Sequence, residues 1–485
     1  MITFKTLFYT SHRVLGTFLS ILFLIWFISG FVLIFHYFPR VHDKERMNRL
    51  DPLPDNLPAI ADIPLPQTKI QNMEMKLVSG YPQLFVTSPD SFYRIPVSKA
   101  DDFLSYNHST AYALRWCNSD IVRIDTLYNL EQWIPFSKYR ADFPIYKFYF
   151  ADNKHHQLYI SSRTGEAIQF TDAHNRLWAW LGAIPHWVYF TRLRQDTGLW
   201  KTAVISISGL GSFMCLSGLV IGVRALAIQY RRKKNLRSVY KKKVYKWHHL
   251  SGFIFGIFVF TYIFSGMMSL QRIPQWIVRT VRPDIKPSVD RNFMPMTAIS
   301  YPLDYRKILD KYSGNIKSIV WSSFGNIPVY KVYANNNWTL IDASADSVKP
   351  LEVDSAMLAN RFRLVHPEDS VQIVLLTDYD NYYIHQRRAL HLPVYKVSAN
   401  DADKNIYYVN PKTGDIKNYN NNTRLRKWMY QALHCFNIKF LVERPLLWNI
   451  VIWSTMTGGT VVSATGVWLG WKWLKRKWRK KNKIK

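Results

Sequence analysis

The chain has 485 residues, a formal net charge of +31 and 48% hydrophobic residues. Its basic excess is concentrated in residues 1–13, 222–247 and 471–485, which hold 21 Lys and Arg and no Asp or Glu. Clustering of basic residues in short segments is typical of the cytoplasmic parts of membrane proteins. Membrane topology therefore explains the positive charge, and no nucleic acid is expected as a partner. Three cysteines are too few for a disulfide framework, and no phosphate-binding loop or zinc spacing is present.

Four charge-free apolar runs predict four transmembrane helices. They extend over Val14–Phe38, Thr202–Val223, Leu250–Leu270 and Pro445–Trp471. Each run reaches the roughly 20 residues that a bilayer core requires. The first run is too long for a signal-peptide core and lacks a cleavage site, so we expect it to be retained. All 33 acidic residues lie in the two long intervening segments, which places both termini in the cytoplasm.

The predicted fold class is a membrane α + β protein with four transmembrane helices in two repeats, each repeat carrying a β-rich outer domain. In chain order, we expect transmembrane helix 1 in 1–39, outer domain 1 in 40–195 with a membrane-edge helix at 174–192, transmembrane helix 2 in 196–224, a basic cytoplasmic loop in 225–247, transmembrane helix 3 in 248–271, outer domain 2 in 272–444 with a membrane-edge helix at 422–438, transmembrane helix 4 in 445–472 and a basic tail in 473–485. The basic loop and tail are expected to contact anionic membrane lipids.

Two blocks of matching residues indicate the duplication. His12, Gly16, Ser29 and Gly30 recur at identical spacing as His248, Gly252, Ser265 and Gly266. A second block has a constant offset of 248, from Arg176, Leu177, Trp180, His186, Leu199, Trp200, Gly211, Gly218 and Gly222 to Arg424, Leu425, Trp428, His434, Leu447, Trp448, Gly459, Gly466 and Gly470. The glycines alone do not discriminate between close helix packing and room for a cofactor.

The outer segments show strand and turn patterns. Pro-x-Tyr-Lys openings occur at 144–147, 328–331 and 393–396, so the second outer segment is expected to contain two β units. Tyr81 to Pro96 is a weaker candidate for the corresponding extra unit of the first segment. The Pro-rich residues 52–66 are interpreted as an extended linker.

The four repeated histidines are the candidate site residues. A single histidine at a membrane edge is commonly an interfacial anchor, and His36 and His42 are assigned that role. His12, His248, His186 and His434 differ, because they persist where most positions between the repeats have diverged. Paired imidazoles at both membrane faces suit axial ligation of haem iron. Helix length separates His12 from His186, so we predict that His12 pairs with His248 and His186 with His434. His249 is an alternative to His248, although the glycine spacing favours His248.

The helix opening at His12, the segment Tyr408 to Asp415 and the helix from Arg424 to His434 resemble the PepSY-associated transmembrane helix family. That family includes iron-regulated inner-membrane proteins and ferric-siderophore reductases. The resemblance covers nearly the whole chain, and one departure is Pro185 before His186, where the family usually has leucine. It implies two b-type haems, a bacterial inner-membrane location with periplasmic outer domains, and reduction of a ferric siderophore or other iron chelate. Its electron donor would be quinol or a cytoplasmic reductant.

Two other classes of function remain open. A haem-free scaffold or regulator would bind a periplasmic partner through the outer domains. A transporter is disfavoured, since none of the four apolar runs contains Asp, Glu, Lys or Arg. Five histidines of the outer segments are interpreted as solvated surface residues: His155, His156, His366, His385 and His391. Cys435 is interpreted as a structural residue. Basic and aromatic outer side chains would suit an anionic chelate, but the sequence singles out none of them.

Overall fold

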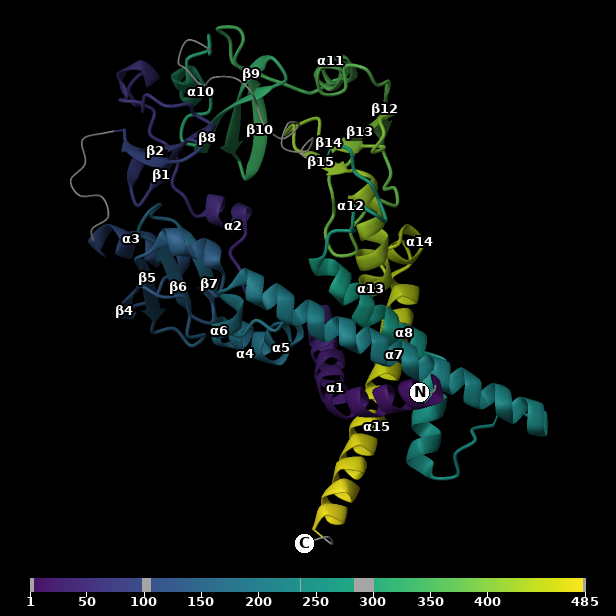
Figure 1. Ribbon diagram of the computed structural model, residues 1–485. Coiled ribbons are helices and arrows are strands. Elements are labelled where there is room, and N and C mark those ends of the chain that lie inside the picture. Colours follow the sequence, from purple (N-terminus) through teal and green to yellow (C-terminus); the bar gives the residue numbers. More distant parts are fainter. Residues whose placement is uncertain (1–3, 98–105, 236, 283–300, 483–485) are drawn as a thin grey trace.

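The computed structural model describes residues 4–97, 106–235, 237–282 and 301–482. Four helices are long and apolar enough to cross a membrane: α1 (Phe4–Phe35), α7 (Thr197–Lys233), α8 (Lys243–Leu270) and α15 (Pro445–Lys481). Both α1 and α8 pack against α7 and against α15, which forms a four-helix bundle. Figure 1 shows all the sheets on one side of this bundle, with the C-terminus and the turn between α7 and α8 away from them.

Two of the long helices continue beyond their predicted ends. Helix α7 runs nine residues past position 224, and α15 runs nine residues past position 472. Much of the predicted basic loop and tail is therefore helical, because Arg and Lys are good helix formers and solvate readily where the apolar run stops. The last three residues of the predicted tail, 483–485, lie outside the described residues.

Short helices replace each single membrane-edge helix of the prediction. The first region contains α4 (Ala173–Leu181), α5 (Ala183–Trp187) and α6 (Thr191–Arg194). The second contains α12 (Asn421–Arg426), a π-helical turn (Lys427–Ala432), α13 (Leu433–Cys435) and α14 (Lys439–Val442). The chain reverses after α5 and α13 because Val188 and Phe436 adopt left-handed conformations, with φ of 55° and 49°. Non-glycine residues rarely adopt such angles, so two matching cases mark a shared backbone turn.

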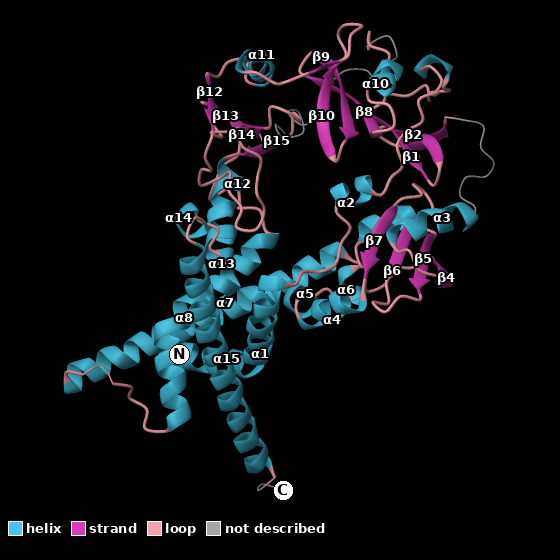
Figure 2. Ribbon diagram, turned by 180° about the vertical axis from the view of Figure 1, so that it is seen from behind, coloured by secondary structure: helices cyan, strands magenta, loops and turns pink. Residues whose placement is uncertain are grey.

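The remaining helices and all strands belong to the outer part. Its helices are α2 (Asp43–Asn48), α3 (Tyr106–Trp116), α10 (Tyr305–Lys311) and α11 (Ser355–Val365), with short 3₁₀ turns at Ile60–Asp62 and Ser137–Asp142. Its strands are β1 (Asn72–Val78), β2 (Tyr81–Thr87), β3 (Phe92–Pro96), β4 (Ile121–Leu127), β5 (Ile145–Phe150), β6 (Gln157–Ser161), β7 (Ala167–Thr171), β8 (Ile316–Phe324), β9 (Ile327–Ala334), β10 (Asn337–Asp342), β11 (Lys349–Pro350), β12 (Val371–Leu376), β13 (Val394–Ala399), β14 (Ile406–Val409) and β15 (Ile416–Tyr419). Figure 2 shows these strands gathered into three groups beyond the bundle.

Three antiparallel sheets make the outer part, and one of them is shared by both halves of the chain. The two four-stranded sheets have the orders β4-β5-β6-β7 and β12-β13-β14-β15. The seven-stranded sheet has the order β11-β10-β9-β8-β1-β2-β3. Its halves join where β1 pairs with β8, with Met73 opposite Trp321 and Lys76 opposite Ser318. Two separate outer domains were expected. Instead, strands β1–β3 of the first half and β8–β11 of the second half form a single sheet.

Residues 52–66 contain no strand, but a 3₁₀ turn at Ile60–Asp62 interrupts the expected extended linker, and the segment is not free in solvent. Leu53, Leu57 and Ile63 are buried in the core of the seven-stranded sheet. Apolar side chains at these positions gain more from burial than from a solvated linker, at about 25 cal/mol per Å². The three Pro-x-Tyr-Lys segments do open strands β5, β9 and β13.

Candidate functional site

The four repeated histidines form two pairs, and the pairing is the one predicted. The ring centroids of His12 and His248 are 6.2 Å apart, and those of His186 and His434 are 6.1 Å apart. Each pair joins one histidine from the first half of the chain with one from the second. The structure thus brings together all four candidate residues in two distinct places within the helical bundle.

In the outer pair, both Nδ1 atoms are hydrogen-bonded to the first spanning helix of the same half. His186 Nδ1 lies 3.0 Å from the carbonyl oxygen of Trp26 on α1 and 3.2 Å from Ser29 Oγ. His434 Nδ1 lies 3.1 Å from the carbonyl oxygen of Tyr262 on α8 and 3.1 Å from Ser265 Oγ. A carbonyl oxygen only accepts, so Nδ1 carries the proton in both rings. The lone pair of each neutral imidazole is therefore on Nε2.

In the inner pair, the second spanning helices supply the contacts. His12 Nδ1 donates to the carbonyl oxygen of Met214 on α7 at 3.0 Å. His248 Nδ1 lies 2.9 Å from Thr465 Oγ1 on α15. Among the described residues, no hydrogen-bond partner contacts Nε2 of any of the four histidines. Fixing one ring nitrogen with a hydrogen bond while the other stays free is the usual arrangement of a metal-binding histidine.

Each of the four rings also packs against a helical glycine that recurs in both halves. A Cβ at Gly30 would lie 3.4 Å from His186 Cε1, and one at Gly266 would lie 3.5 Å from His434 Cε1. A Cβ at Gly218 would lie only 2.5 Å from His12 Cε1, whereas at Gly466 it would lie 3.7 Å from His248 Cε1. These recurring glycines leave room for the imidazole rings. Close helix packing alone would not explain why each of the four glycines faces a histidine.

His249 is excluded as a ligand because both of its ring nitrogens are engaged. Its Nδ1 lies 2.9 Å from Ser238 Oγ, and its Nε2 lies 3.3 Å from the carbonyl oxygen of Gly222. His36 stacks on Trp178, with ring centroids 4.3 Å apart and planes 4° apart, so its interfacial role stays a prediction. His248, and not its neighbour, is the residue whose ring lies opposite His12.

The outer pair lies deeper in the bundle than the sequence indicated. Trp26, which binds His186, precedes the end of α1 by nine residues. It follows His12 by 14 residues, or about 21 Å of helix. The short helices α5 and α13 bring His186 and His434 inward, and the left-handed residues after them allow the chain to return. A position at the outer edge was expected because a single long helix was assumed.

The donor set fits haem iron. Two imidazoles bound to one metal ion from opposite sides would have ring centroids about 6.2 Å apart, given metal–nitrogen bonds of about 2.0 Å and roughly 1.1 Å from nitrogen to centroid. The observed separations are 6.2 and 6.1 Å. Bis-histidine ligation is among the axial sets that proteins use for haem, and both rings of each pair present a free Nε2. His12 with His248 and His186 with His434 are therefore the residues that could hold a metal-bearing cofactor in the bundle.

A group of basic residues above the outer pair was not identified from the sequence. Lys417 and Lys427 are close enough to repel each other, and Arg388 is close to His385. Burial and the Lys417 charge lower the pKa of Lys427 to about 8. Burial also lowers the pKa of Lys417, and burial with the neighbouring cations lowers the pKa of His385. We call Lys417, Lys427, Arg388 and His385 the basic cluster.

The carboxylate nearest the basic cluster is already engaged. Asp380 Oδ2 accepts hydrogen bonds from Lys396 Nζ at 2.9 Å and Tyr408 Oη at 2.6 Å. Asp380 Oδ1 accepts backbone N–H groups of Tyr382 and Tyr383. Cations that repel one another without a free carboxylate favour binding of an anion.

Tyrosines border the basic cluster and connect it to the histidine pair. Lys427 Nζ lies 5.5 Å from the ring centroid of Tyr382, and Lys417 Nζ lies 5.6 Å from that of Tyr383. Tyr430 lies three residues after Lys427, and its ring centroid is 5.5 Å from that of His434. The π-helical turn that carries Lys427 of the cluster thus also carries a tyrosine beside the outer pair.

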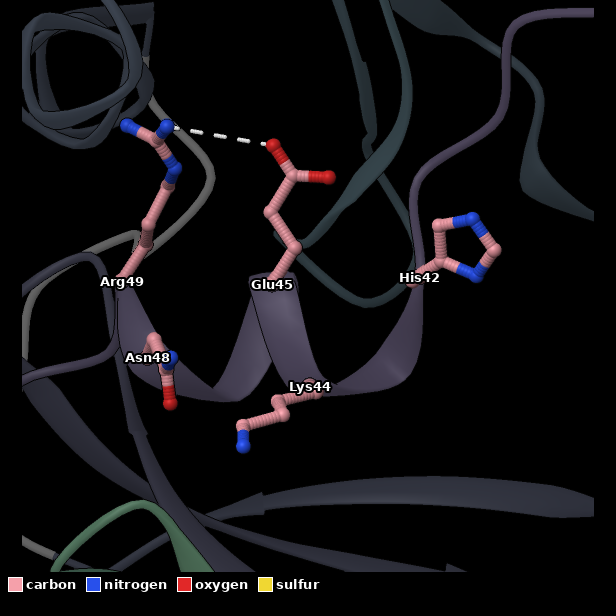
Figure 3. A pocket seen from close by; sticks show the side chains of 5 residues that line it. All are labelled: His42, Lys44, Glu45, Asn48 and Arg49. Atoms are coloured by element: carbon pink, nitrogen blue, oxygen red, sulfur yellow. Dashed lines mark ion pairs between the residues drawn. The ribbon is translucent and has the colours of Figure 1, made fainter. Parts of the chain in front are cut away.

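A surface hollow beside the outer helix α2 is a different feature. It has a volume of about 500 Å³ beside α2 and is lined by His42, Lys44, Glu45, Asn48 and Arg49 (Figure 3). Glu45 and Arg49 form an ion pair of 3.8 Å across one helical turn. Its lining contains both signs of charge and none of the paired histidines.

The remaining predictions concern the outer histidines and the cysteines. His366 is buried at 1% exposure, so its interpretation as a solvated surface residue was wrong; the C-terminal end of α11 places it under Tyr407. Cys117 and Cys435 do not form a disulfide. The Cys435 carbonyl oxygen accepts from Trp448 Nε1 at 3.0 Å, as the Trp187 carbonyl accepts from Trp200 at 2.9 Å. This shared backbone contact agrees with a structural role for the Cys435 position.

In the part of the chain that the structure describes, the fold is that of an α + β protein with four helices able to cross a membrane. Two separate histidine pairs lie between these helices. No family model matches the chain, and no curated protein is significantly similar to it in sequence. The resemblance to the PepSY-associated family accordingly remains a prediction.

Proposed function

We propose that this chain is a bacterial inner-membrane haem protein that passes electrons across the membrane to a periplasmic ferric siderophore or another iron chelate. The observation that carries the proposal is the pairing of His12 with His248 and of His186 with His434, each with a free Nε2. Haem bound by such pairs would supply reversible one-electron chemistry. The PepSY-like character of the outer sheets and the two-repeat organisation belong to the same proposal.

The orientation follows from charge. The basic ends of α7 and α15 and the start of α8 would face the cytoplasm, and the three sheets the periplasm. The inner pair would then be close to a cytoplasmic or quinol donor, and the outer pair close to the acceptor. Beside the outer pair, the rings of Phe27 and Tyr262 pack edge to face with centroids 5.7 Å apart, and the Tyr262 ring centroid lies 5.6 Å from that of His434.

The basic cluster would hold the acceptor. Ferric siderophores commonly present hard anionic oxygens, and protonated Lys427 with Lys417 and Arg388 would attract them. The bordering tyrosines offer flat apolar surface to the organic part of a chelate. Since the oxygen ligands that suit iron(III) hold iron(II) less tightly, a single electron delivered here would release the metal.

The test begins with the purified full-length protein in detergent, reduced with dithionite in stoichiometric amount. Mixing with a ferric siderophore should reoxidise the haem, and a chromogenic chelator should trap one ferrous ion per electron. His186→Ala and His434→Ala should each abolish the same one of two haems and slow this reaction. His249→Ala is the matched control, because its nitrogens are hydrogen-bonded elsewhere. If the protein purifies without a haem spectrum, the scaffold alternative replaces this proposal; if reduced haem ignores every iron chelate, an electron relay to a partner protein does.

A further inference from the structure

The first four-stranded sheet carries three potential metal ligands outside the membrane bundle. They are Cys117, directly after α3, and Asp152 and His156, in the turn between β5 and β6. Cys117 Sγ lies 3.7 Å from His156 Nδ1, and Asp152 Oδ2 lies 2.8 Å from the same nitrogen. A thiol, an imidazole and a carboxylate therefore converge on one point.

The turn is held in place before any ligand binds. Asp152 Oδ1 accepts the backbone N–H of His156 at 3.0 Å, and Oδ2 accepts that of Lys154 at 2.9 Å. The His156 ring stacks on Phe170, with centroids 4.8 Å apart and planes 3° apart. Phe170 packs in turn against Trp116, the residue before Cys117. Ligands that are oriented by their neighbours lose little conformational freedom on binding.

The other four-stranded sheet provides an internal comparison. At the equivalent place it has His366 after α11 and Asp401 and Asn405 in the turn between β13 and β14. The turn has the same bonds, since Asp401 Oδ1 accepts Asn405 N at 2.9 Å and Asp401 Oδ2 accepts Asn405 Nδ2 at 2.6 Å. His366 Nε2 is bonded to Tyr407 Oη at 2.8 Å, and its Nδ1 lies 3.4 Å from Asp369 Oδ2 and 3.6 Å from Asp401 Oδ2, so both ring nitrogens of His366 have partners.

The first network is not closed in this way. The Tyr407 position corresponds to Leu158, which has no hydroxyl, and His156 stands where Asn405 does. A single proton on His156 Nδ1 can be donated to Asp152 or shared toward Cys117, but it does not serve both contacts. The side chains of Asp152 and His156 are 19% and 18% exposed, so the point where the three groups meet is reachable from solvent. The substitutions thus replace a closed hydrogen-bond network with an open set of ligands.

We propose that Cys117 Sγ, Asp152 Oδ2 and His156 Nδ1 bind a divalent ion of the zinc type, with water in the fourth position. In a tetrahedral zinc site, sulfur and nitrogen ligands are about 3.5 Å apart. The observed 3.7 Å between Cys117 and His156 is close to this, whereas Asp152 must move outward by about 0.5 Å. On binding, the thiol proton is released to solvent and the imidazole proton moves from Nδ1 to Nε2.

The site is tested with zinc on the full-length protein, after removal of adventitious metal with a chelator. Dialysis against Zn²⁺ and elemental analysis should give one tightly bound zinc per chain. Zinc-edge X-ray absorption should show one sulfur neighbour, a signal to which haem iron does not contribute. Cys117→Ser should remove the sulfur neighbour. His156→Asn, which copies the turn of the other sheet, should weaken binding by about tenfold or more while preserving the fold.

Cys435→Ser is the matched control, because that cysteine is also unpaired but has no such neighbours among the described residues. It should bind zinc as the unchanged protein does. The proposal fails if no zinc is retained, or if the sulfur neighbour persists in Cys117→Ser. The sulfur neighbour does not depend on whether the histidine pairs carry haem, because those pairs contain no thiol.

Discussion

Gly218→Ala tests the inner histidine pair without touching a proposed ligand. The new Cβ would lie 2.5 Å from Cε1 and 2.8 Å from Nδ1 of His12, so the ring must move by about 1 Å to restore ordinary contact. The hydrogen bond from His12 Nδ1 to the Met214 carbonyl is 3.0 Å long and would be lost by such a shift. The ring would then no longer present Nε2 toward His248.

The size of the effect follows from two terms. Overpacking at a rigid position costs about 1–3 kcal/mol. Loss of the hydrogen bond adds about 0.5–1.5 kcal/mol. Their sum corresponds to a tenfold to roughly thousandfold weaker hold on the inner haem, at about 1.4 kcal/mol per decade. The haem between His186 and His434 should be retained, because neither ring contacts Gly218.

Gly466→Ala is the matched control at the corresponding position of the other half. There the new Cβ would lie 3.7 Å from His248 Cε1, which is ordinary contact, and 3.1 Å from Ser20 Cβ. Haem per protein, measured from the pyridine haemochrome after extensive washing, should fall from two toward one in Gly218→Ala and stay near two in Gly466→Ala. Equal losses in the two variants, or a larger loss in Gly466→Ala, would refute the reasoning.

Three further predictions concern the outer part and the topology. Glu166 is buried with Lys76 at 2.9 Å and Arg46 at 3.8 Å, so Glu166→Gln should lower the free energy of unfolding by about 3 kcal/mol in denaturant titrations. Burial alone would raise the pKa of Glu166, but Lys76 and Arg46 outweigh it and lower that pKa; its stabilisation is therefore present above pH 4.5 and lost as pH falls through the lower folded value. Because the pKa of Lys427 is lowered to about 8, reoxidation of the haem by an anionic chelate should slow as pH rises through 8. The Lys427→Gln variant should react slowly already at pH 7. A reoxidation rate independent of pH in the unchanged protein would remove Lys427 from the acceptor site. Reporter fusions at Asn235 and at the C-terminus should be cytoplasmic and those near Asp120 and Asp354 periplasmic, and the reverse pattern would overturn the assigned faces.

The histidine pairing could be predicted because it depends on local spacing. A helix has a fixed rise per residue, so the distance from His12 to the far end of α1 was known before the structure. Repeated spacing then left only the partner in the other half. The depth of the outer pair could not be predicted, because it depends on left-handed backbone at Val188 and Phe436, for which neither valine nor phenylalanine is a signal.

The shared sheet was missed for a different reason. Strands β1 and β8 pair across more than 200 residues of sequence, and their register is set by tertiary packing of residues such as Met73 and Trp321. Alternation predicts that a strand exists but not which distant strand it pairs with. The basic cluster was missed because its members are spread over 385–427 and become neighbours only when the chain folds back.

The two halves of the chain contribute equivalent hydrogen bonds to the histidine pairs. Each outer histidine is oriented by the first spanning helix of its own half, and each inner histidine by the second. One half therefore builds one side of both sites and completes neither. The seven-stranded sheet has the same property, since β1 and β8 come from different halves. The halves therefore associate at two separate places, the histidine pairs in the helical bundle and the β1–β8 junction in the outer part.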